Sequence, residues 1–378
     1  KAVLKDDVDT IIASILSALG SLYSSVGDII RARMVTVEAL SLYRRLEAEG
    51  DPQWIEQAMT LNNLGNILRK VREVASAKEA YLESLALYKE RVIPTHPDHL
   101  PRYGITLNNL GNLFRVEKQA ERAEENYRKA IDVYRQAEDL GMGSFDFERS
   151  SVFNNLGTLY CDSGQRQRAM AAYEEALSYT QRLKEHCPRV YLSHLATTLH
   201  NLAYIYHELS YMDRAVETYQ RAIETFEELG SPRNAVVEEA YVLTLSHYGR
   251  LLGERGRAEE ARTVICQALI EQAALSSRNP VGLLARLESV CESAGELLAD
   301  APLEERQAKG EAIYDACLPQ GPLVWLALCD LFLRMEQDDL AIRIYGLCWA
   351  LVGGLKPRID RRLDGLREEL ERRFGRQA

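Results

Sequence analysis

The sequence lacks the motifs that usually hold a cofactor or a nucleotide. No GxxxxGK[ST] loop is present, so the chain has no P-loop for a phosphate. Its seven cysteines are scattered along 378 residues without a CxxC or zinc-type spacing. Scattered cysteines of this kind are typical of reduced thiols. We therefore expect a cytoplasmic protein without cofactors.

The chain also lacks an excess of positive charge and an apolar run of membrane length. Its 46 Lys and Arg stand against 56 Asp and Glu, a formal charge of −10, which disfavours nucleic acid as a partner. The apolar segment Ile11–Tyr23 follows Asp6, Asp7 and Asp9, where a signal peptide would carry positive charge. We expect no membrane contact. Because the sequence begins with Lys1, we expect a processed product or a fragment of a longer protein.

A repeat of 46 residues runs through most of the sequence. The segment TLNNLGN occurs at Thr60–Asn66 and again at Thr106–Asn112, and VFNNLGT follows at Val152–Thr158. The equivalent positions of five copies are Asn63, Asn109, Asn155, Asn201 and His247. Small residues recur at fixed distances after each of them, and a tyrosine follows the first four at a fixed distance, with Ile265 in its place in the fifth copy. These spacings predict pairs of amphipathic helices that approach closely at small residues, with aromatic side chains between neighbouring hairpins.

The frame resembles the tetratricopeptide repeat, with Leu-Gly and an aromatic residue followed by Ala, an aromatic residue and Ala. The segment Thr95–Arg115, a His-Pro-Asp loop before Leu-Asn-Asn-Leu, is similar to the repeats of kinesin light chains. The resemblance implies an all-α fold: an α-solenoid, a right-handed superhelix of about eight hairpins with a C-terminal capping helix. The expected boundaries are six hairpins in 1–275, a degenerate hairpin in 276–320, another repeat-like hairpin in 321–354 and the capping helix in 355–378.

The C-terminal region shows a second likeness. Residues 338–375 are similar to the end of the helical sensor arm in bacterial STAND-type signalling ATPases and regulators, with Ala341, Tyr345 and Gly346 at matching positions. This similarity implies a ligand-sensing role within a longer protein. Because the chain contains no nucleotide-binding motif, the similarity does not extend to ATPase activity.

In a solenoid of this type, the first helix of each hairpin lines the concave surface, so its polar residues are candidates for binding. An amide side chain carries donors and an acceptor and can pair with a peptide backbone in either direction. Arginine on the same surface favours an acidic or phosphorylated segment or a terminal carboxylate. The predicted peptide-binding residues are Asn62, Asn63, Asn66, Arg69, Asn108, Asn109, Asn112, Arg115, Asn154, Asn155, His200, Asn201, Tyr204, His207, His247 and Arg250.

Other roles for these residues stay open at this point. The asparagines could instead bond neighbouring helices and fix their stacking, or one amide of each pair could pack while the other binds. Tyr204 is either a core residue or a platform for a ligand. His200, His207 and His247 could form a metal site, although only Cys161 joins them at a matching step.

No arrangement of residues predicts catalysis, and His186-Cys187 is only a pair at a helix end. We therefore expect a non-catalytic scaffold for protein–protein interaction that binds an extended, acidic peptide or protein segment in its groove. The alternative is the ligand-sensing arm of a larger bacterial signalling protein, whose ATPase, protease or transcription-regulator domain lies outside this chain. Self-association through the terminal helices is a further expectation.

Overall fold

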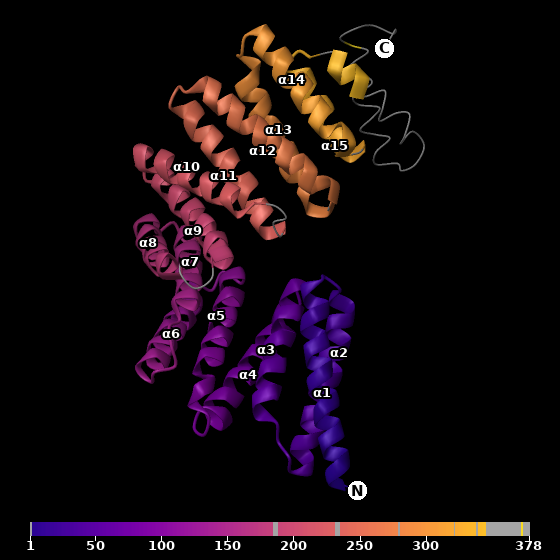
Figure 1. Ribbon diagram of the computed structural model, residues 1–378, viewed down its shortest axis with the longest axis vertical. Helices are drawn as coiled ribbons and strands as arrows, with labels where there is room; N and C mark the ends of the chain where they lie inside the picture. The colour runs from indigo at the N-terminus through magenta and orange to yellow at the C-terminus, as the bar shows by residue number, and fades with distance from the viewer. Residues whose placement is uncertain are drawn as a thin grey trace. The chain divides into compact units, whose positions relative to one another are not determined.

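The computed structural model is built from α-helices, most of which form antiparallel pairs (Figure 1). It describes residues 2–183, 188–230, 235–278, 280–320, 322–337, 339–344 and Arg372. This part of the chain contains fifteen α-helices and no β-strand. The all-α solenoid class that the repeat predicts is confirmed.

The chain divides into two compact units, and the first, Lys1–His186, consists of four hairpins. The two helices of each hairpin pack along their length, and each hairpin also packs on the next. The pairs are α1 (Ala2–Ser25) with α2 (Ile29–Glu49), α3 (Trp54–Lys70) with α4 (Val74–Leu87), α5 (Leu100–Val116) with α6 (Ala120–Asp139), and α7 (Asp146–Asp162) with α8 (Arg166–Arg182).

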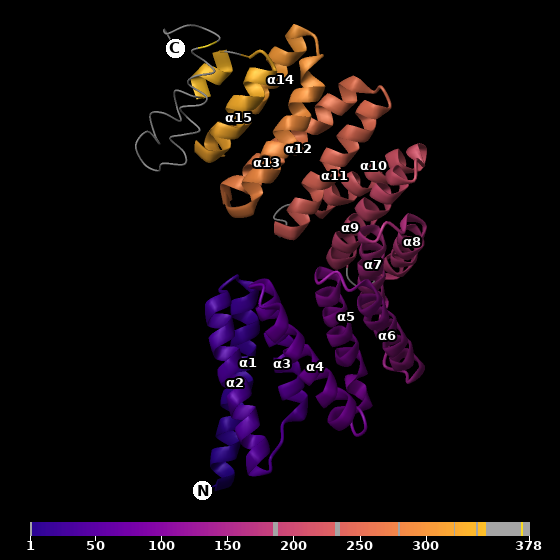
Figure 2. The same cartoon turned by 180° about the vertical axis from the view of Figure 1, so that it is seen from behind.

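The second unit, Cys187–Ala378, begins with two more hairpins. These are α9 (Pro188–Glu208) with α10 (Met212–Leu229), and α11 (Ala235–Glu254) with α12 (Ala258–Arg278). Next, α13 (Pro280–Ala299) packs on α12 and on α15 (Pro322–Arg334), and α14 (Leu303–Cys317) packs on α12, as the view from behind also shows (Figure 2). The second half of the hairpin expected in 321–354 and the expected capping helix lie outside the described residues.

The 46-residue register is visible in the backbone as well as in the side chains. The second helices α4, α6, α8, α10 and α12 begin at equal steps of the chain. In the turn before each of them, one residue adopts the left-handed conformation: Arg72, Lys118, Gly164, Ser210 and Gly256, with φ between 59° and 73°. Such a turn needs this conformation, which a residue with a Cβ adopts at a cost.

This turn gives a prediction for paired substitutions at one register. We expect Lys118→Gly to raise the free energy of unfolding by about 0.5–1 kcal/mol, because glycine adopts positive φ without strain. Gly164→Lys should lower it by about 1 kcal/mol for the same reason. Urea unfolding followed by circular dichroism measures both changes, and shifts in the same direction would contradict the explanation.

Glycines on the first helices allow a tyrosine ring of the second helix to lie directly on the backbone. A Cβ added to Gly111 would lie 2.7 Å from a ring carbon of Tyr127. Gly65 with Tyr81 and Gly157 with Tyr173 have the same arrangement. The spacing of these tyrosines therefore places their rings on the facing helix of their own hairpin. Other repeat aromatics contact a neighbouring hairpin as the sequence predicts, since Phe114 lies against Lys78 and Tyr219 against Tyr248.

The sixth repeat supplies a matched control for this close approach. There Gly249 faces Ile265, and an added Cβ would meet its nearest atoms at 3.4–3.5 Å, an ordinary contact distance. We expect Gly111→Ala to lower the free energy of unfolding by about 1–3 kcal/mol through overpacking. Gly249→Ala should leave it unchanged or raise it slightly, because alanine favours the helix. Equal effects in urea unfolding would show that the tyrosine contact does not limit the packing.

Candidate functional site

In the first unit the first helices of successive hairpins lie side by side. Helix α1 contacts α3, α3 contacts α5, and α5 contacts α7. The polar residues that the repeat places on α3, α5 and α7 are all half-buried. We call these residues the inner row: Asn62, Asn63, Asn66, Arg69, Asn108, Asn109, Asn112, Arg115, Asn154 and Asn155.

The asparagines of the inner row bond one repeat to the next. Nδ2 of Asn109 donates to Oδ1 of Asn62, and Nδ2 of Asn155 donates to Oδ1 of Asn108, each at 2.9 Å. Both bonds join residues that are 47 positions apart, one repeat length plus one residue. In the preceding hairpin Ser21 takes the place of the acceptor for Asn63, at 3.0 Å. These bonds fix the register in which neighbouring hairpins stack.

A second set of amides closes each hairpin. The hydroxyl of Tyr81 donates to Oδ1 of Asn66 at 2.9 Å, and the hydroxyl of Tyr127 donates to Oδ1 of Asn112 at 2.8 Å. Burial raises the pKa of both tyrosines to about 12, so both hydroxyls stay protonated donors at neutral pH. Thr158 replaces the amide in the next repeat, 3.2 Å from the hydroxyl of Tyr173.

The hydrogen bonds described above use only part of the capacity of seven asparagine side chains. An asparagine side chain can donate two hydrogen bonds and accept two. In seven members of the inner row, only one of the two polar atoms has a partner among the described residues. In Asn62, Asn66, Asn108 and Asn112 the Nδ2 atom has no such partner, and in Asn63, Asn109 and Asn155 the Oδ1 atom has none. Donors and acceptors therefore both remain along the row.

The two arginines of the inner row differ in their partners. Arg115 forms an ion pair with Asp162, 47 positions later, at 2.7 Å. At the position equivalent to Asp162, the hairpin after Arg69 has Val116, and no described carboxylate pairs with Arg69. The Nε of each arginine is buried without an acceptor. Arg69 is thus a half-buried cation with unsatisfied hydrogen-bonding capacity.

In the second unit, histidines occupy the positions of the bonded asparagines. His200 on α9 and His247 on α11 are again 47 positions apart, and their rings stack with centroids 5.5 Å apart. Tyr204 lies next to His247 at 5.3 Å. The hydroxyl of Thr244 donates to the carbonyl of Ala240, so its oxygen accepts the Nδ1–H of His200 at 2.9 Å. A ring stack here takes the place of the amide bond.

Two further predicted residues of this unit, His207 and Arg250, lie near the carboxylate of Glu254. Nε2 of His207 lies 2.7 Å from the Glu254 carboxylate, the pairing equivalent to Arg115 with Asp162. Arg250 lies 3.8 Å from the same carboxylate. Asn201 is half-buried on α9. The structure therefore brings His207, Arg250 and Glu254 together, whereas His200 is buried beneath His247.

Burial controls the protonation of the stacked pair. It lowers the pKa of His200 to about 3, and together with the positive charge of Arg250 it lowers the pKa of His247 to about 4. Both rings are therefore neutral at pH 7. The Nδ1 of His247 is buried without a partner, so protonating it would place an uncompensated charge in the stack.

The stacked pair predicts a dependence of stability on pH. An unfolded histidine has a pKa near 6.5 and takes up a proton in mild acid, whereas the folded rings do not. Stability should therefore be complete above pH 6.5 and decrease by about 2 kcal/mol or more as the pH falls toward 4.5. Replacing both rings by asparagine, the residue of the other repeats, should remove most of this decrease. Thermal melts at each pH compare the two proteins, and identical pH profiles would contradict the assignment.

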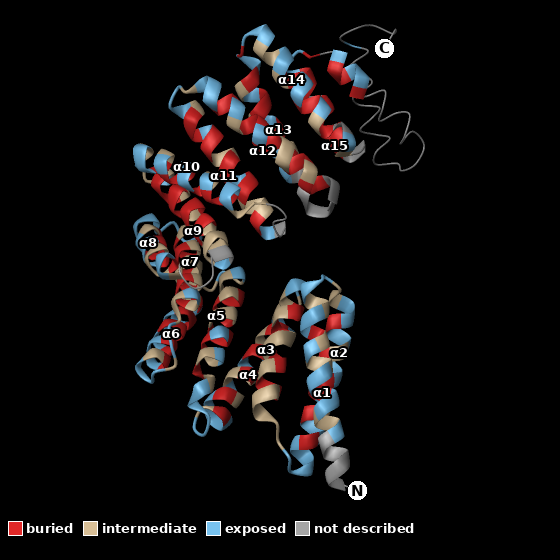
Figure 3. Cartoon of the chain, viewed as in Figure 1, coloured by how far each residue is buried: buried red, intermediate tan, exposed pale blue. Residues whose placement is uncertain are grey.

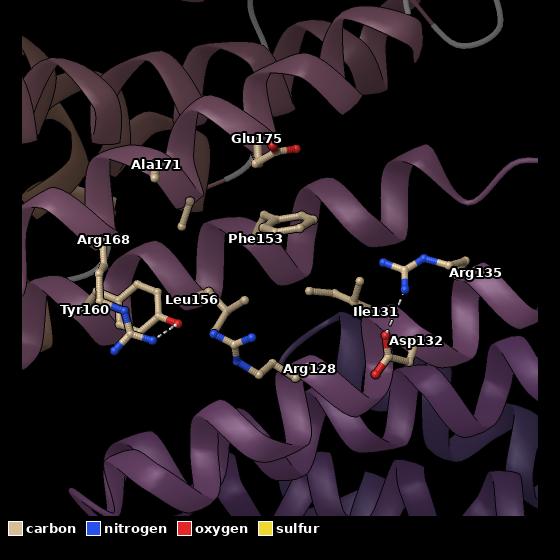
Figure 4. A pocket seen from close by; sticks show the side chains of 11 residues that line it. Arg128, Ile131, Asp132, Arg135, Phe153, Leu156, Tyr160, Arg168, Ala171 and Glu175 are labelled. Carbon is tan, nitrogen blue, oxygen red and sulfur yellow. Dashed lines mark hydrogen bonds and ion pairs between the residues drawn. The ribbon is translucent and has the colours of Figure 1, made fainter.

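A cavity of about 420 Å³ lies between α6, α7 and α8 (Figure 4). Ile131, Phe153 and Leu156 supply apolar side chains, and three arginines line it as well. The arginines are already engaged: Arg128 and Arg168 share Glu124 at 2.9 and 2.6 Å, and Arg135 pairs with Asp132 at 3.3 Å. The lining includes two repeated positions, Leu156 and Tyr160, but their spacing in the sequence does not show that a cavity lies beside them.

Metal-binding and catalytic groupings were also open questions. Among the described residues, no group of three or more His, Cys, Asp or Glu side chains is placed to hold a metal ion. His186 and Cys187 lie outside the described residues. The partners that sequence reasoning missed are Ser21, Tyr81, Tyr127, Asp162 and Glu254. The offset of 47 positions is the signal that would have found Asp162 and Glu254.

Comparisons with known proteins agree with this geometry. Tetratricopeptide repeat family models match residues 56–136, 150–183 and 196–228. The chain contains tetratricopeptide repeats. The matched stretches cover α4, α5 and α8 in full and most of α3, α6, α7, α9 and α10. No curated protein matches the sequence.

Solved structures with similar repeats share the fold at low identity. BtubC (BKLC) from P. vanneervenii is 23% identical, with a TM-score of 0.50 over 60% of this chain and 84% of that chain. A STAND protein with a tetratricopeptide repeat sensor from Pyrococcus horikoshii is 12% identical, with a TM-score of 0.56 over 95% of this chain and 47% of that chain. NprR in complex with its cognate peptide NprX is 15% identical, with a TM-score of 0.50 over 90% and 86%.

Proposed function

We propose that the chain is a non-catalytic scaffold that binds an extended, acidic segment of a partner protein along the inner row of the first unit. The supporting observation is that seven amides use one polar atom to bond the next hairpin or the tyrosine of their own hairpin, while the other polar atom has no partner among the described residues. The seven amides lie on α3, α5 and α7. Arg69, also on α3, is a half-buried cation without a described carboxylate partner. Tetratricopeptide repeats are protein-interaction modules, and this row supplies a specific surface.

The Nδ2 and Oδ1 atoms without a described partner match the donors and acceptors of a peptide backbone. The Nδ2 groups would donate to carbonyl oxygens of the segment, and the Oδ1 atoms would accept its N–H groups. The guanidinium of Arg69 would hold a carboxylate of the segment. Each hydrogen bond contributes about 1 kcal/mol, so binding requires several repeats to act together. NprR, which has this fold, was solved with its cognate peptide.

A second candidate role is that of the ligand-sensing arm of a larger signalling protein. The STAND structure favours it, because its likeness covers 95% of this chain but 47% of that protein. In this role the inner row would bind the signal, and an effector elsewhere would respond. The described cysteines Cys161, Cys266, Cys291, Cys317 and Cys329 are thiols, which supports a reducing, cytoplasmic setting for both roles.

The inner row can be tested with substitutions that preserve the stack. In Asn66→Thr/Asn112→Thr, each threonine can still bond its tyrosine, as Thr158 does. The Nδ2 donor of each asparagine, which has no described partner, is lost. Arg69→Gln removes a charge that has no described ion pair. The probe is a pool of unstructured peptides rich in Asp and Glu, measured by fluorescence anisotropy. We expect either variant to weaken binding of the tightest peptide by about tenfold, equivalent to about 1.4 kcal/mol.

Two controls accompany this measurement. Arg135→Gln makes the same charge change on α6, away from the inner row, and should leave binding unchanged. A pool with Lys in place of Asp and Glu should not be retained by the unaltered protein. Retention of the Lys pool, or equal binding by all variants, would contradict the proposal. Thermal melts of each variant show whether a loss of binding comes from unfolding.

A further inference from the structure

Exposed apolar side chains gather on the first hairpin. Large apolar residues that are 42–77% exposed follow α1, the turn after it and the first half of α2. They are Val8, Ile11, Ile12, Ile15, Leu22, Val26, Ile30, Met34 and Val37, nearly half of such residues in the described chain. We call this set the terminal apolar face, and Figure 3 shows how much of these two helices is exposed.

The terminal apolar face lies on one side of each helix. In α1 the spacing of Val8, Ile11, Ile15 and Leu22 repeats every seven residues, which gives a single stripe. The opposite side of α1 packs inward through Ala13 and Gly20, and Ser17 and Ser21 bond the next hairpin. The face is therefore on the side of the first hairpin that points away from α3.

The face is large enough for a stable interface. Its exposed fractions correspond to roughly 800–900 Å² of apolar surface, which is about what one partner contributes to a standard protein–protein interface. Soluble monomers rarely expose a contiguous apolar patch of this size.

The charges around the face indicate which partner would cover it. The chain has no charged residue between Thr10 and Gly27, although its formal charge is −10. The flanking guanidinium groups of Arg31, Arg33 and Arg45 are each neutralised by a carboxylate. Two acidic copies would repel each other through most surfaces, but the α1 part of this face carries no charge from Thr10 to Gly27, and Glu38 is the exposed carboxylate beside its α2 part.

A membrane fits these charges less well. The expectation that no apolar run reaches membrane length is wrong, because the stretch Val8–Ser25 is long and apolar enough to span a membrane by length and composition. However, its Ser17 and Ser21 are bonded to α3, and Asp9 pairs with Arg45 of α2, so it is integrated into a hairpin. A helix that lies on an anionic lipid surface usually carries Lys and Arg on its polar face, and α1 has one lysine, Lys5.

We propose that a second copy of this chain covers the terminal apolar face, so that the protein is a dimer in which α1 and α2 of both copies pack on each other. The same patch serves both copies, as in a two-fold symmetric interface. The dimer would present two inner rows to its partners and leave both of them accessible.

Analytical ultracentrifugation of the whole chain over a range of concentrations tests the dimer. We expect the unaltered protein to dimerise at micromolar concentration. Ile15→Asp/Leu22→Asp should raise the dimer dissociation constant at least a hundredfold, while the circular dichroism spectrum stays unchanged because both side chains are exposed. The control Val116→Asp/Leu140→Asp alters equally exposed apolar residues outside the face and should leave the dimer intact.

A second measurement covers the case in which the aspartate variant misfolds. Hydrogen exchange of the unaltered protein should show protection of α1 and the start of α2 that increases with concentration. A monomer at 100-fold above micromolar concentration, a dimer that persists in the folded aspartate variant, or unchanged exchange would overturn the proposal. So would flotation of the unaltered monomer with phosphatidylcholine–phosphatidylglycerol vesicles that the aspartate substitutions abolish.

Discussion

The contact between a tyrosine ring and a bare glycine backbone determines the geometry of the first-unit repeats. It holds the two helices of a hairpin close enough for the tyrosine hydroxyl to reach Asn66 or Asn112 on the facing helix. That bond orients the amide, and the neighbouring asparagines then reach the next hairpin. Both the helix packing and the polar surface thus depend on the absence of a side chain at Gly65, Gly111 and Gly157.

Much of the fold could be predicted because the repeat is written in the sequence. The steps from Asn63 to His247 predicted the hairpins and their register, and both are present. The contacts between neighbouring hairpins were predicted for the aromatics, but the contact of Tyr81 and Tyr127 with their own hairpin was not, because a spacing of aromatic residues does not reveal which helix a ring contacts. That depends on the space above Gly65 or Gly111, which only the packed helices define.

The candidate site could be predicted as a set of residues but not as a set of bonds. The sequence placed the asparagines on shared helix faces, but it left open whether they pack or bind. The structure shows that Asn109 and Asn155 use one polar atom for stacking, which leaves ligand binding by the other atom as a proposal. The partners of Arg115 and His207 lie 47 residues later, an offset that only the stagger between neighbouring hairpins makes meaningful.

The exchange of amides for imidazoles between the two units has a consequence for the order of unfolding. In a repeat array each hairpin touches mainly its neighbours, so the weakest contact decides where the array opens first. The hydrogen bonds between asparagine side chains do not change with pH, whereas the imidazole rings of His200 and His247 become protonated in acid. Acid would therefore open the second unit first, at α9 and α11, and expose its cysteine-containing core to proteases while the amide-bonded hairpins persist.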